Sequence, residues 1–129
     1  MREFGRVLFV GAGGFIGAVA RYVLGGWVHS IVPMSTFPWG TLAVNISGCF
    51  LIGLLGGLAE SRRTFGPEVR MFIFIGVLGG FTTFSSFAHE TLALARDAEF
   101  VRASANIAGQ VIGGLASAWL GYALIRSLT

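Results

Sequence analysis

Long apolar runs separated by short polar segments dominate the chain. Four of them are long enough to cross a membrane, because a spanning helix needs roughly 20 mostly apolar residues. The first runs from Val7 to about Val28 and is interrupted only by Arg21. The other three contain no Asp, Glu, Lys or Arg, and they cover Phe37–Ala59, Met71–His89 and Ala103–Ile125. The pattern predicts an all-α membrane protein with a single domain over residues 1–129, whose helices lie at about 5–29, 37–60, 70–95 and 102–127.

Composition supports this class. Hydrophobic residues make up 54% of the chain and charged residues 12%, whereas a soluble domain carries about 25% charged residues. The mean hydropathy is +0.78. The chain therefore has too little polar surface to cover itself in water.

The basic residues lie mostly in the termini and connections. All 9 are arginine, and in a soluble protein such a balance would suggest a nucleic-acid partner. Here it is the ordinary charge pattern of membrane topology, so no nucleic acid is expected. With both termini inside, the cytoplasmic arginines are Arg2, Arg6, Arg62, Arg63, Arg70 and Arg126. Arg96 and Arg102 then lie outside, with Arg21 near that end, which favours both termini in the cytoplasm.

The N-terminal run has two alternative interpretations. Ala18-Val19-Ala20 resembles a signal-peptide cleavage site, but apolar sequence resumes directly after Arg21, as a full span requires. Gly11, Gly14 and Gly17 have a spacing found in nucleotide-binding turns. That fold needs an acidic residue about 20 residues later, and the first one is Glu60. A membrane helix with a small-residue face is favoured.

Small residues recur four apart in every predicted helix. The pairs are Gly13/Gly17, Gly53/Gly57, Gly76/Gly80 and Gly109/Gly113, the last continued by Ser117 and Gly121. Lipid gives apolar helices little reason to associate, so such ridges predict close backbone packing. Four helices pack around a filled centre. A transport pathway therefore needs more helices to line it than one chain supplies, which predicts a homodimer.

The third run is unusually polar. Between Gly79 and Glu90 it carries Thr82, Thr83, Ser85, Ser86 and His89 among three phenylalanines. Polar groups inside a membrane segment usually mark a path for a polar species. Gly79-Gly80 followed by Thr82-Thr83 predicts a helix break, because both residue types have low helix propensity. The freed carbonyls need protein, water or a cation that prefers oxygen ligands.

Three further features each allow a structural and a functional interpretation. Asn45 in the second run either makes an interhelical hydrogen bond or donates an amide N–H to an anion. Phe84 and Phe87 either pack in the core or present their positive ring edges to an anion. Arg21 either reaches the lipid headgroups or draws anions into a vestibule.

Enzyme signatures are excluded by local spacing. His89-Glu90 is not a zinc-protease motif, because Ala93 stands where the second histidine is required. Ser85, His89 and Glu90 lie too close together in one helix to form a nucleophilic triad with an oxyanion hole. The sequence therefore predicts no enzyme.

Three segments carry a resemblance to a known family. They are Gly13–Tyr22, Gly40–Asn45 and Gly79–Phe87, the last reading Gly-Gly-Phe-Thr-Thr-Phe-Ser-Ser-Phe. Over essentially its whole length the chain resembles the Fluc (CrcB) family of small bacterial fluoride channels. The resemblance implies an antiparallel, dual-topology homodimer in the bacterial inner membrane that exports fluoride passively through two pores along the subunit interface.

The resemblance also implies residue roles. Asn45, Phe84 and Phe87 match pore residues of the family, and backbone oxygens at Gly79 and Thr82 match those that hold a structural sodium ion at the dimer centre. The remaining pathway positions are Arg21, Thr41, Thr83, Ser85, Ser86 and Glu90. Members often carry a pore-facing serine in helix 4, where this chain has Asn106, Gly109 and Gln110 nearby.

Two rival functions remain open. A small multidrug-type, proton-coupled exporter is also a four-helix dimer, but such proteins resemble one another in a glutamate within helix 1, and the only acid here before Glu60 is Glu3. A non-transporting assembly subunit is the other rival. It predicts no flux and tolerance of Asn45→Ala.

Overall fold

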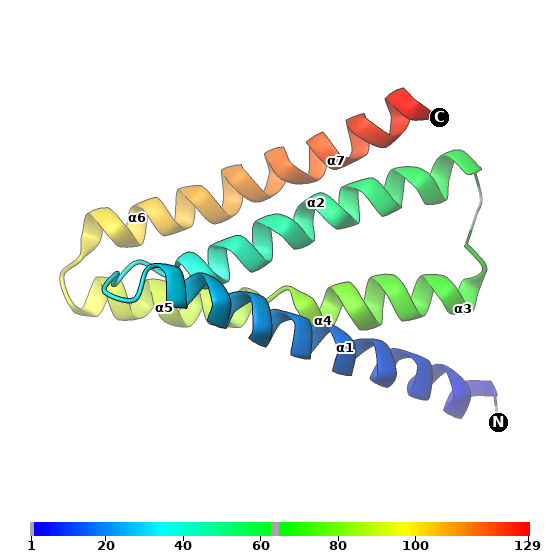
Figure 1. The fold of residues 1–129 in the computed structure, drawn as a ribbon, viewed down its shortest axis with the longest axis horizontal. Coiled ribbons are helices and arrows are strands. Elements are labelled where there is room, and N and C mark those ends of the chain that lie inside the picture. The colour runs from blue at the N-terminus through cyan, green and yellow to red at the C-terminus, as the bar shows by residue number, and fades with distance from the viewer. Residues whose placement is uncertain (1, 63–64) are drawn as a thin grey trace.

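The computed structural model describes residues 2–62 and 65–129 and consists of four helical spans (Figure 1). The first two are α1 (Arg2–Ile31) and α2 (Trp39–Arg62). The third is built from α3 (Pro67–Arg70), η1 (Met71–Leu78), α4 (Gly79–Phe81) and α5 (Phe84–Arg96). The fourth is built from α6 (Phe100–Ala108), η2 (Gly109–Gly113) and α7 (Gly114–Leu128). Each span is long and apolar enough to cross a membrane, so the predicted all-α class is confirmed.

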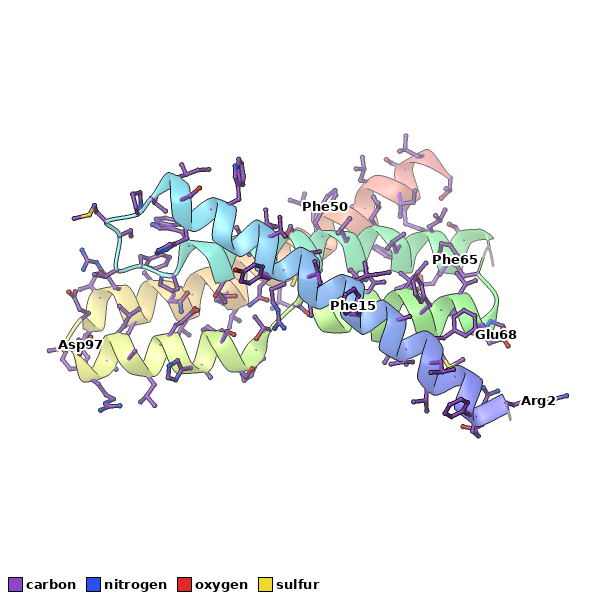
Figure 2. All side chains as sticks on the ribbon, turned by 60° about the horizontal axis from the view of Figure 1, so that its bottom comes forward. Arg2, Phe15, Phe50, Phe65, Glu68 and Asp97 are labelled. Carbon is purple, nitrogen blue, oxygen red and sulfur yellow. The ribbon has the colours of Figure 1, made fainter. Side chains whose placement is uncertain are left out.

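Successive spans run in opposite directions, and both chain ends lie at the same end of the bundle as α3 (Figure 1). The α1–α2 and α5–α6 connections lie at the opposite end. Arg2 and Glu68 therefore lie far from Asp97 (Figure 2). Arg63, assigned from the sequence to the cytoplasmic group, lies outside the described residues. The main packing pairs are α2 with α7, α1 with η1, α2 and α4, and α5 with α6.

The glycine ridges form the helix contacts, as the sequence predicts. A Cβ atom on Gly17 would overlap the carbonyl oxygen of Val77, and one on Gly80 would lie 2.6 Å from the carbonyl oxygen of Gly14. On the other side of the bundle, a Cβ atom on Gly53 would overlap the carbonyl oxygen of Ala118. Any side chain at these positions would push two backbones apart.

The third span is broken, as predicted, and the break lies at Thr82 and Thr83. Both have extended backbones, with φ −80° and ψ 156° at Thr82 and φ −147° and ψ 110° at Thr83. Gly79 keeps helical angles, with φ −64° and ψ −36°. The threonines therefore end the helix, whereas Gly80 allows close contact with α1. A new helix, α5, begins after Thr83, whose Oγ1 accepts a hydrogen bond from Ser86 N at 3.2 Å.

Two stretches wind as π-helix, which the sequence does not predict. They are η1, directly before the break, and η2, in the middle of the fourth span. A π-turn inserts an extra residue and re-aims the side chains that follow, and such turns are frequent at functional sites.

Large apolar side chains cover the outer faces of the spans (Figure 2). Phe4, Phe15, Trp27, Ile112 and Leu115 are each more than half exposed within the subunit. Such a surface suits a bilayer or a second subunit rather than water.

Candidate functional site

The break in the third span is held by one side chain from α2. The Oδ1 atom of Asn45 accepts a hydrogen bond from Thr83 N at 2.8 Å. The Nδ2 atom of Asn45 donates to Thr83 O at 2.9 Å. Because Thr83 is extended, its N–H and C=O point sideways out of the helix axis, and a primary amide can satisfy both.

A chain of side-chain hydrogen bonds continues from Asn45 to the fourth span and back. Asn45 Nδ2 also donates to Gln110 Oε1 at 3.0 Å, and Gln110 Nε2 donates to Asn106 Oδ1 at 3.5 Å. Asn106 is fully buried, and its Nδ2 donates to Thr91 Oγ1 at 2.9 Å. Thr91 Oγ1 then donates to Phe87 O at 2.7 Å. We call this set the amide chain.

A cavity of about 330 Å³ lies beside the break. We call it the aromatic cavity. Its lining includes Asn45, Gly79, Thr82, Thr83, Phe84, Phe87 and Gln110. Four of the nine residues that the sequence assigned to the anion path, and both residues assigned to a cation, therefore line one cavity. The lining contains no Asp, Glu, Lys, Arg or His.

The phenylalanine pair lies at the rim of this cavity. The ring centroids of Phe84 and Phe87 are 5.3 Å apart with an interplanar angle of 64°. Phe84 is 77% exposed, whereas Phe87 is half-buried. Core packing within the subunit therefore does not explain Phe84. Its ring faces whatever covers this side of the subunit.

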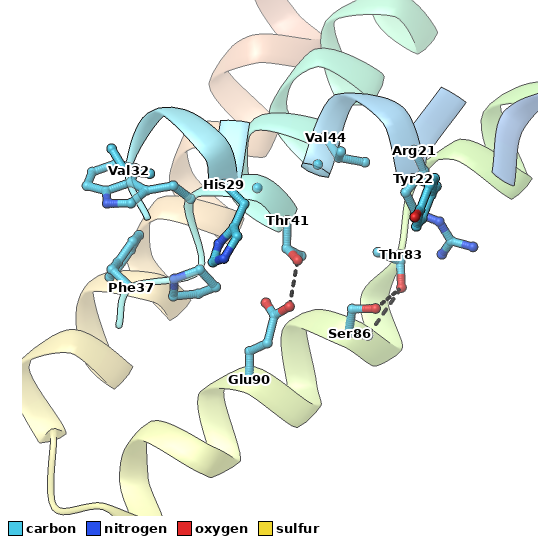
Figure 3. Close-up of a pocket in the computed structure, with 14 residues that line it drawn as sticks. Arg21, Tyr22, His29, Val32, Phe37, Thr41, Val44, Thr83, Ser86 and Glu90 are labelled. Atoms are coloured by element: carbon cyan, nitrogen blue, oxygen red, sulfur yellow. Dashed lines mark hydrogen bonds between the residues drawn. The ribbon is translucent and has the colours of Figure 1, made fainter. Parts of the chain in front are cut away.

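A second cavity, of about 280 Å³, lies toward the α1–α2 connection. We call it the polar cavity. Figure 3 shows Arg21 and His29 from α1, Thr41 from α2, and Ser86 and Glu90 from α5 around it. Basic, acidic and hydroxyl groups share this space, in contrast to the uncharged aromatic cavity.

Glu90 has an unusual environment within the polar cavity. Its Oε1 accepts a hydrogen bond from Thr41 Oγ1 at 2.7 Å. Its Oε2 is buried and has no partner among the described residues. A buried carboxyl oxygen is costly without a partner, and the polar cavity that Glu90 lines has room for a water molecule or another polar group beside it.

Thr83 borders both cavities and anchors the hydroxyl cluster. Its Oγ1 donates to Ser86 Oγ at 3.0 Å and lies 3.4 Å from Ser85 Oγ. Ser86 lines the polar cavity, whereas Ser85 is exposed. Apart from Ser85, which lines neither cavity, the predicted pathway residues thus fall into two groups that meet at Thr83.

Released backbone carbonyls supply oxygen atoms at the break. In a continuous helix, Thr83 N–H would bond the carbonyl of Gly79, but here it bonds Asn45. Thr82 N and Thr82 Oγ1 both donate to Leu78 O, each at 3.0 Å. The described residues contain no cluster of His, Cys, Asp and Glu that could hold a metal. Neutral carbonyl oxygens at Gly79 and Thr82 fit a hard monovalent cation rather than a transition metal.

The chain matches a known family over nearly all its length. The model of "CrcB-like protein, Camphor Resistance (CrcB)" matches residues 8–122. This chain belongs to the CrcB family. The resemblance found in the sequence motifs is therefore confirmed.

Three curated relatives carry the name "Fluoride-specific ion channel FluC". The protein of Geotalea daltonii is 45% identical over 120 residues, covering 93% of this chain and 96% of its own length. That of Geobacter sulfurreducens is 44% identical over 122 residues, covering 95% and 98%. That of Chlorobium phaeobacteroides is 41% identical over 126 residues, covering 96% and 95%.

In this CrcB-family chain, two polar residues of the hydrogen-bonded site, to which no role was assigned from the sequence, lie in the fourth span. Gln110 and Asn106 lie in an otherwise apolar run, and Gln110 is the only glutamine of the chain. Their isolation among apolar residues was the only sign in the sequence that they take part in a polar site. Their partners could not be derived from it, because contacts across helices depend on how the spans cross.

Proposed function

We propose that this chain forms a fluoride-selective channel that carries fluoride passively out of the cytoplasm and so limits its toxicity. The observation that carries the proposal is the aromatic cavity, where neutral amides and aromatic rings surround a space without fixed charge. The name shared by the curated relatives supports the same ion.

The chemistry of this lining suits a small, strongly hydrated anion. Fluoride must lose water to enter a narrow path, and hydrogen-bond donors replace that water. The edges of Phe84 and Phe87 are weakly positive and offer further contact. Conduction requires binding that is favourable enough for entry and weak enough for exit. Neutral hydrogen-bond donors meet this requirement better than an arginine in the pathway, whose full positive charge would hold the anion too tightly.

The polar cavity is proposed as the entrance. Arg21 lies half-buried on its wall, and a positive charge beside a low-dielectric wall raises the local concentration of anions. The hydroxyls of Thr41, Thr83 and Ser86 then lead toward the aromatic cavity. Ser85 and Glu90 complete the proposed path.

Two copies of the chain are proposed to form the working unit, inserted antiparallel in the bacterial inner membrane. The exposed ring of Phe84 and the exposed Gly79 support this arrangement, because a second subunit would cover both. Two pores would then run along the interface. The carbonyl oxygens of Gly79 and Thr82 from each copy would hold a sodium ion at the dimer centre, where its positive charge favours anions.

A proton-coupled exporter is the second candidate, because Glu90 is an acid within a span and has an unpartnered oxygen. A single experiment separates the two. Purified protein is placed in liposomes loaded with sodium fluoride, with equal, strongly buffered pH inside and outside and a sodium ionophore to carry the compensating charge, and external fluoride is followed with an electrode. Fluoride efflux at equal pH supports the channel, whereas efflux that occurs only with a pH gradient would support the exporter.

A further inference from the structure

We propose that His29 forms part of the entrance to the anion pathway, and that protonation of its imidazole ring speeds the entry of fluoride. His29 lies in the last turn of α1, and no motif in the sequence singles it out. This inference rests on the proposed fluoride channel and adds one side chain to its proposed entrance, the polar cavity.

His29 and Arg21 share one face of α1. Both line the polar cavity, and Gly25, about one turn of helix from each, lines it without a side chain. His29 follows Arg21 by eight residues, which is a rise of about 12 Å along a helix. Figure 3 shows Arg21 near Thr83 and His29 toward the α1–α2 connection. The two residues therefore border one space at different depths, with His29 farther from the break.

The imidazole ring of His29 is free to interact with ions. The residue is exposed within the subunit. Polar groups near it are engaged elsewhere, because Ser30 Oγ donates to Trp27 O at 2.6 Å and Thr41 Oγ1 donates to Glu90 Oε1 at 2.7 Å. Neither ring nitrogen of His29 has a hydrogen-bond partner among the described residues. Protonation of the ring therefore breaks no contact there, and its effect is electrostatic.

Few other charged groups face this ring. Besides His29, the charged or titratable side chains that line the polar cavity are Arg21 and Tyr22 from α1 and Glu90 from α5. The elements α2, η1 and α4 pack against α1 and add none to the lining.

Two further groups lie close by but outside the cavity. His89 precedes Glu90 on α5 and lines neither cavity. Arg102 on α6 donates to Thr36 of the α1–α2 connection at 2.7 Å, and its charge is paired with Glu99 at 3.0 Å.

Protonation of His29 changes the balance of charge in the polar cavity. The positive charge of Arg21 and the negative charge of an ionised Glu90 oppose each other, so the lining has no net charge while His29 is neutral. Whether Glu90 is ionised or protonated, an imidazolium at His29 adds one positive charge. A histidine ordinarily changes its charge between about pH 5 and 8, and positive charge in a cavity with low-dielectric walls raises the local concentration of anions. Fluoride entry should therefore become faster as the pH falls through this range.

The pH dependence of fluoride current tests the inference. Purified protein is placed in a planar bilayer with sodium fluoride and the same pH on both sides, because a current reports the anion and not neutral hydrogen fluoride. At low ionic strength we expect the current at about pH 6 to be about two- to fivefold the current at about pH 8. The ratio should decrease when an inert salt is added, because salt screens an exposed charge.

Two variants of His29 and one control identify the titrating group. His29→Gln removes the charge, so its current should be low and equal at the two pH values. His29→Arg keeps a positive charge at both pH values, so its current should be high and equal. His89→Gln is the control, because His89 is the only other histidine of the chain, and it should keep the pH dependence of the unmodified protein.

The outcomes separate this inference from the proposed function. If the unmodified protein carries no fluoride current at either pH, the proposed function fails and the role of His29 fails with it. If it carries the same current at both pH values, only the role of His29 fails. A pH dependence that persists in His29→Gln would belong to another group, such as Glu90, and would also overturn the inference. The comparison of the unmodified protein at two pH values stands even if a variant does not fold.

Discussion

Asn45 and Thr83 are joined by two hydrogen bonds, one to each polar atom of the Thr83 backbone, at 2.8 and 2.9 Å. The side chain thereby replaces the helical partners that Thr83 lacks. The break in the third span is thus held by a residue 38 positions earlier in the chain, and α2 and α5 are fixed relative to each other at this point.

Replacing this side chain should therefore destabilise the fold. Asn45→Ala leaves Thr83 N–H and C=O without their partner, and each unpaired buried group costs about 1–3 kcal/mol. We expect a lower thermal unfolding temperature in detergent, followed by circular dichroism, together with reduced fluoride efflux. Ser47→Ala is the matched control on α2, because Ser47 Oγ bonds only Val44 O of its own helix, at 3.0 Å. Equal stability of the two variants would contradict the role given to Asn45.

The phenylalanine pair should act on flux rather than on folding. Phe84→Ile and Phe87→Ile remove the positive ring edges but keep apolar volume, so we expect fluoride efflux to fall about tenfold or more. Phe9→Ile is the control, because Phe9 and Phe72 form another edge-to-face pair, with centroids 6.4 Å apart, away from both cavities. Unchanged efflux in Phe84→Ile and Phe87→Ile would show that the ring edges do not contribute to fluoride conduction.

Two glycines on α2 allow the effect of helix–helix packing on stability to be distinguished from the effect of helix propensity. Gly53→Ala places a methyl group against the carbonyl oxygen of Ala118 and should destabilise the fold by about 1–3 kcal/mol. A Cβ atom on Gly56 meets nothing within 4 Å of the subunit, so Gly56→Ala should be neutral or stabilising by up to about 1 kcal/mol. Thermal unfolding of both variants measures the difference. A similar loss of stability in both variants would show that close contact between α2 and α7 is not the reason for glycine at position 53.

Arg21 should act through its charge. Arg21→Gln lowers the positive potential of the polar cavity, and we expect fluoride efflux to fall about two- to tenfold at low ionic strength and less at high salt, because salt screens such fields. Arg6→Gln changes the net charge equally but removes an exposed residue already paired with Glu3 at 2.8 Å, so it serves as the control. An effect of Arg21→Gln that does not depend on salt would argue against electrostatic attraction.

The spans and their packing faces could be predicted because both depend on local sequence. Hydropathy identifies a membrane-length helix, and glycines such as Gly13 and Gly17 mark the face on which backbones can approach. The break was also predictable, but its position was less so. Gly79 and Gly80 suggest it and yet stay helical, because Asn45 from another helix favours the extended conformation at Thr83.

The amide chain could not be derived from the sequence for a related reason. Asn45, Gln110 and Thr91 lie on three different spans, and their meeting depends on crossing geometry. The π-turn at η2 adds to this, because it re-aims Gln110 relative to a regular helix. Polar residues isolated in apolar runs indicate that a network exists, but not which members bond.

Selectivity is the most direct test of the central claim, that neutral donors and ring edges pass fluoride between two copies of this chain. Liposomes containing the purified protein are loaded with equal sodium fluoride and sodium chloride, and the efflux of each anion is measured with its own electrode. The measurement is repeated with sodium replaced by a large organic cation, and in both cases a proton ionophore carries the compensating charge. The account predicts fast fluoride efflux, chloride efflux at the level of protein-free liposomes, and loss of fluoride efflux without sodium. Equal efflux of chloride and fluoride would contradict it.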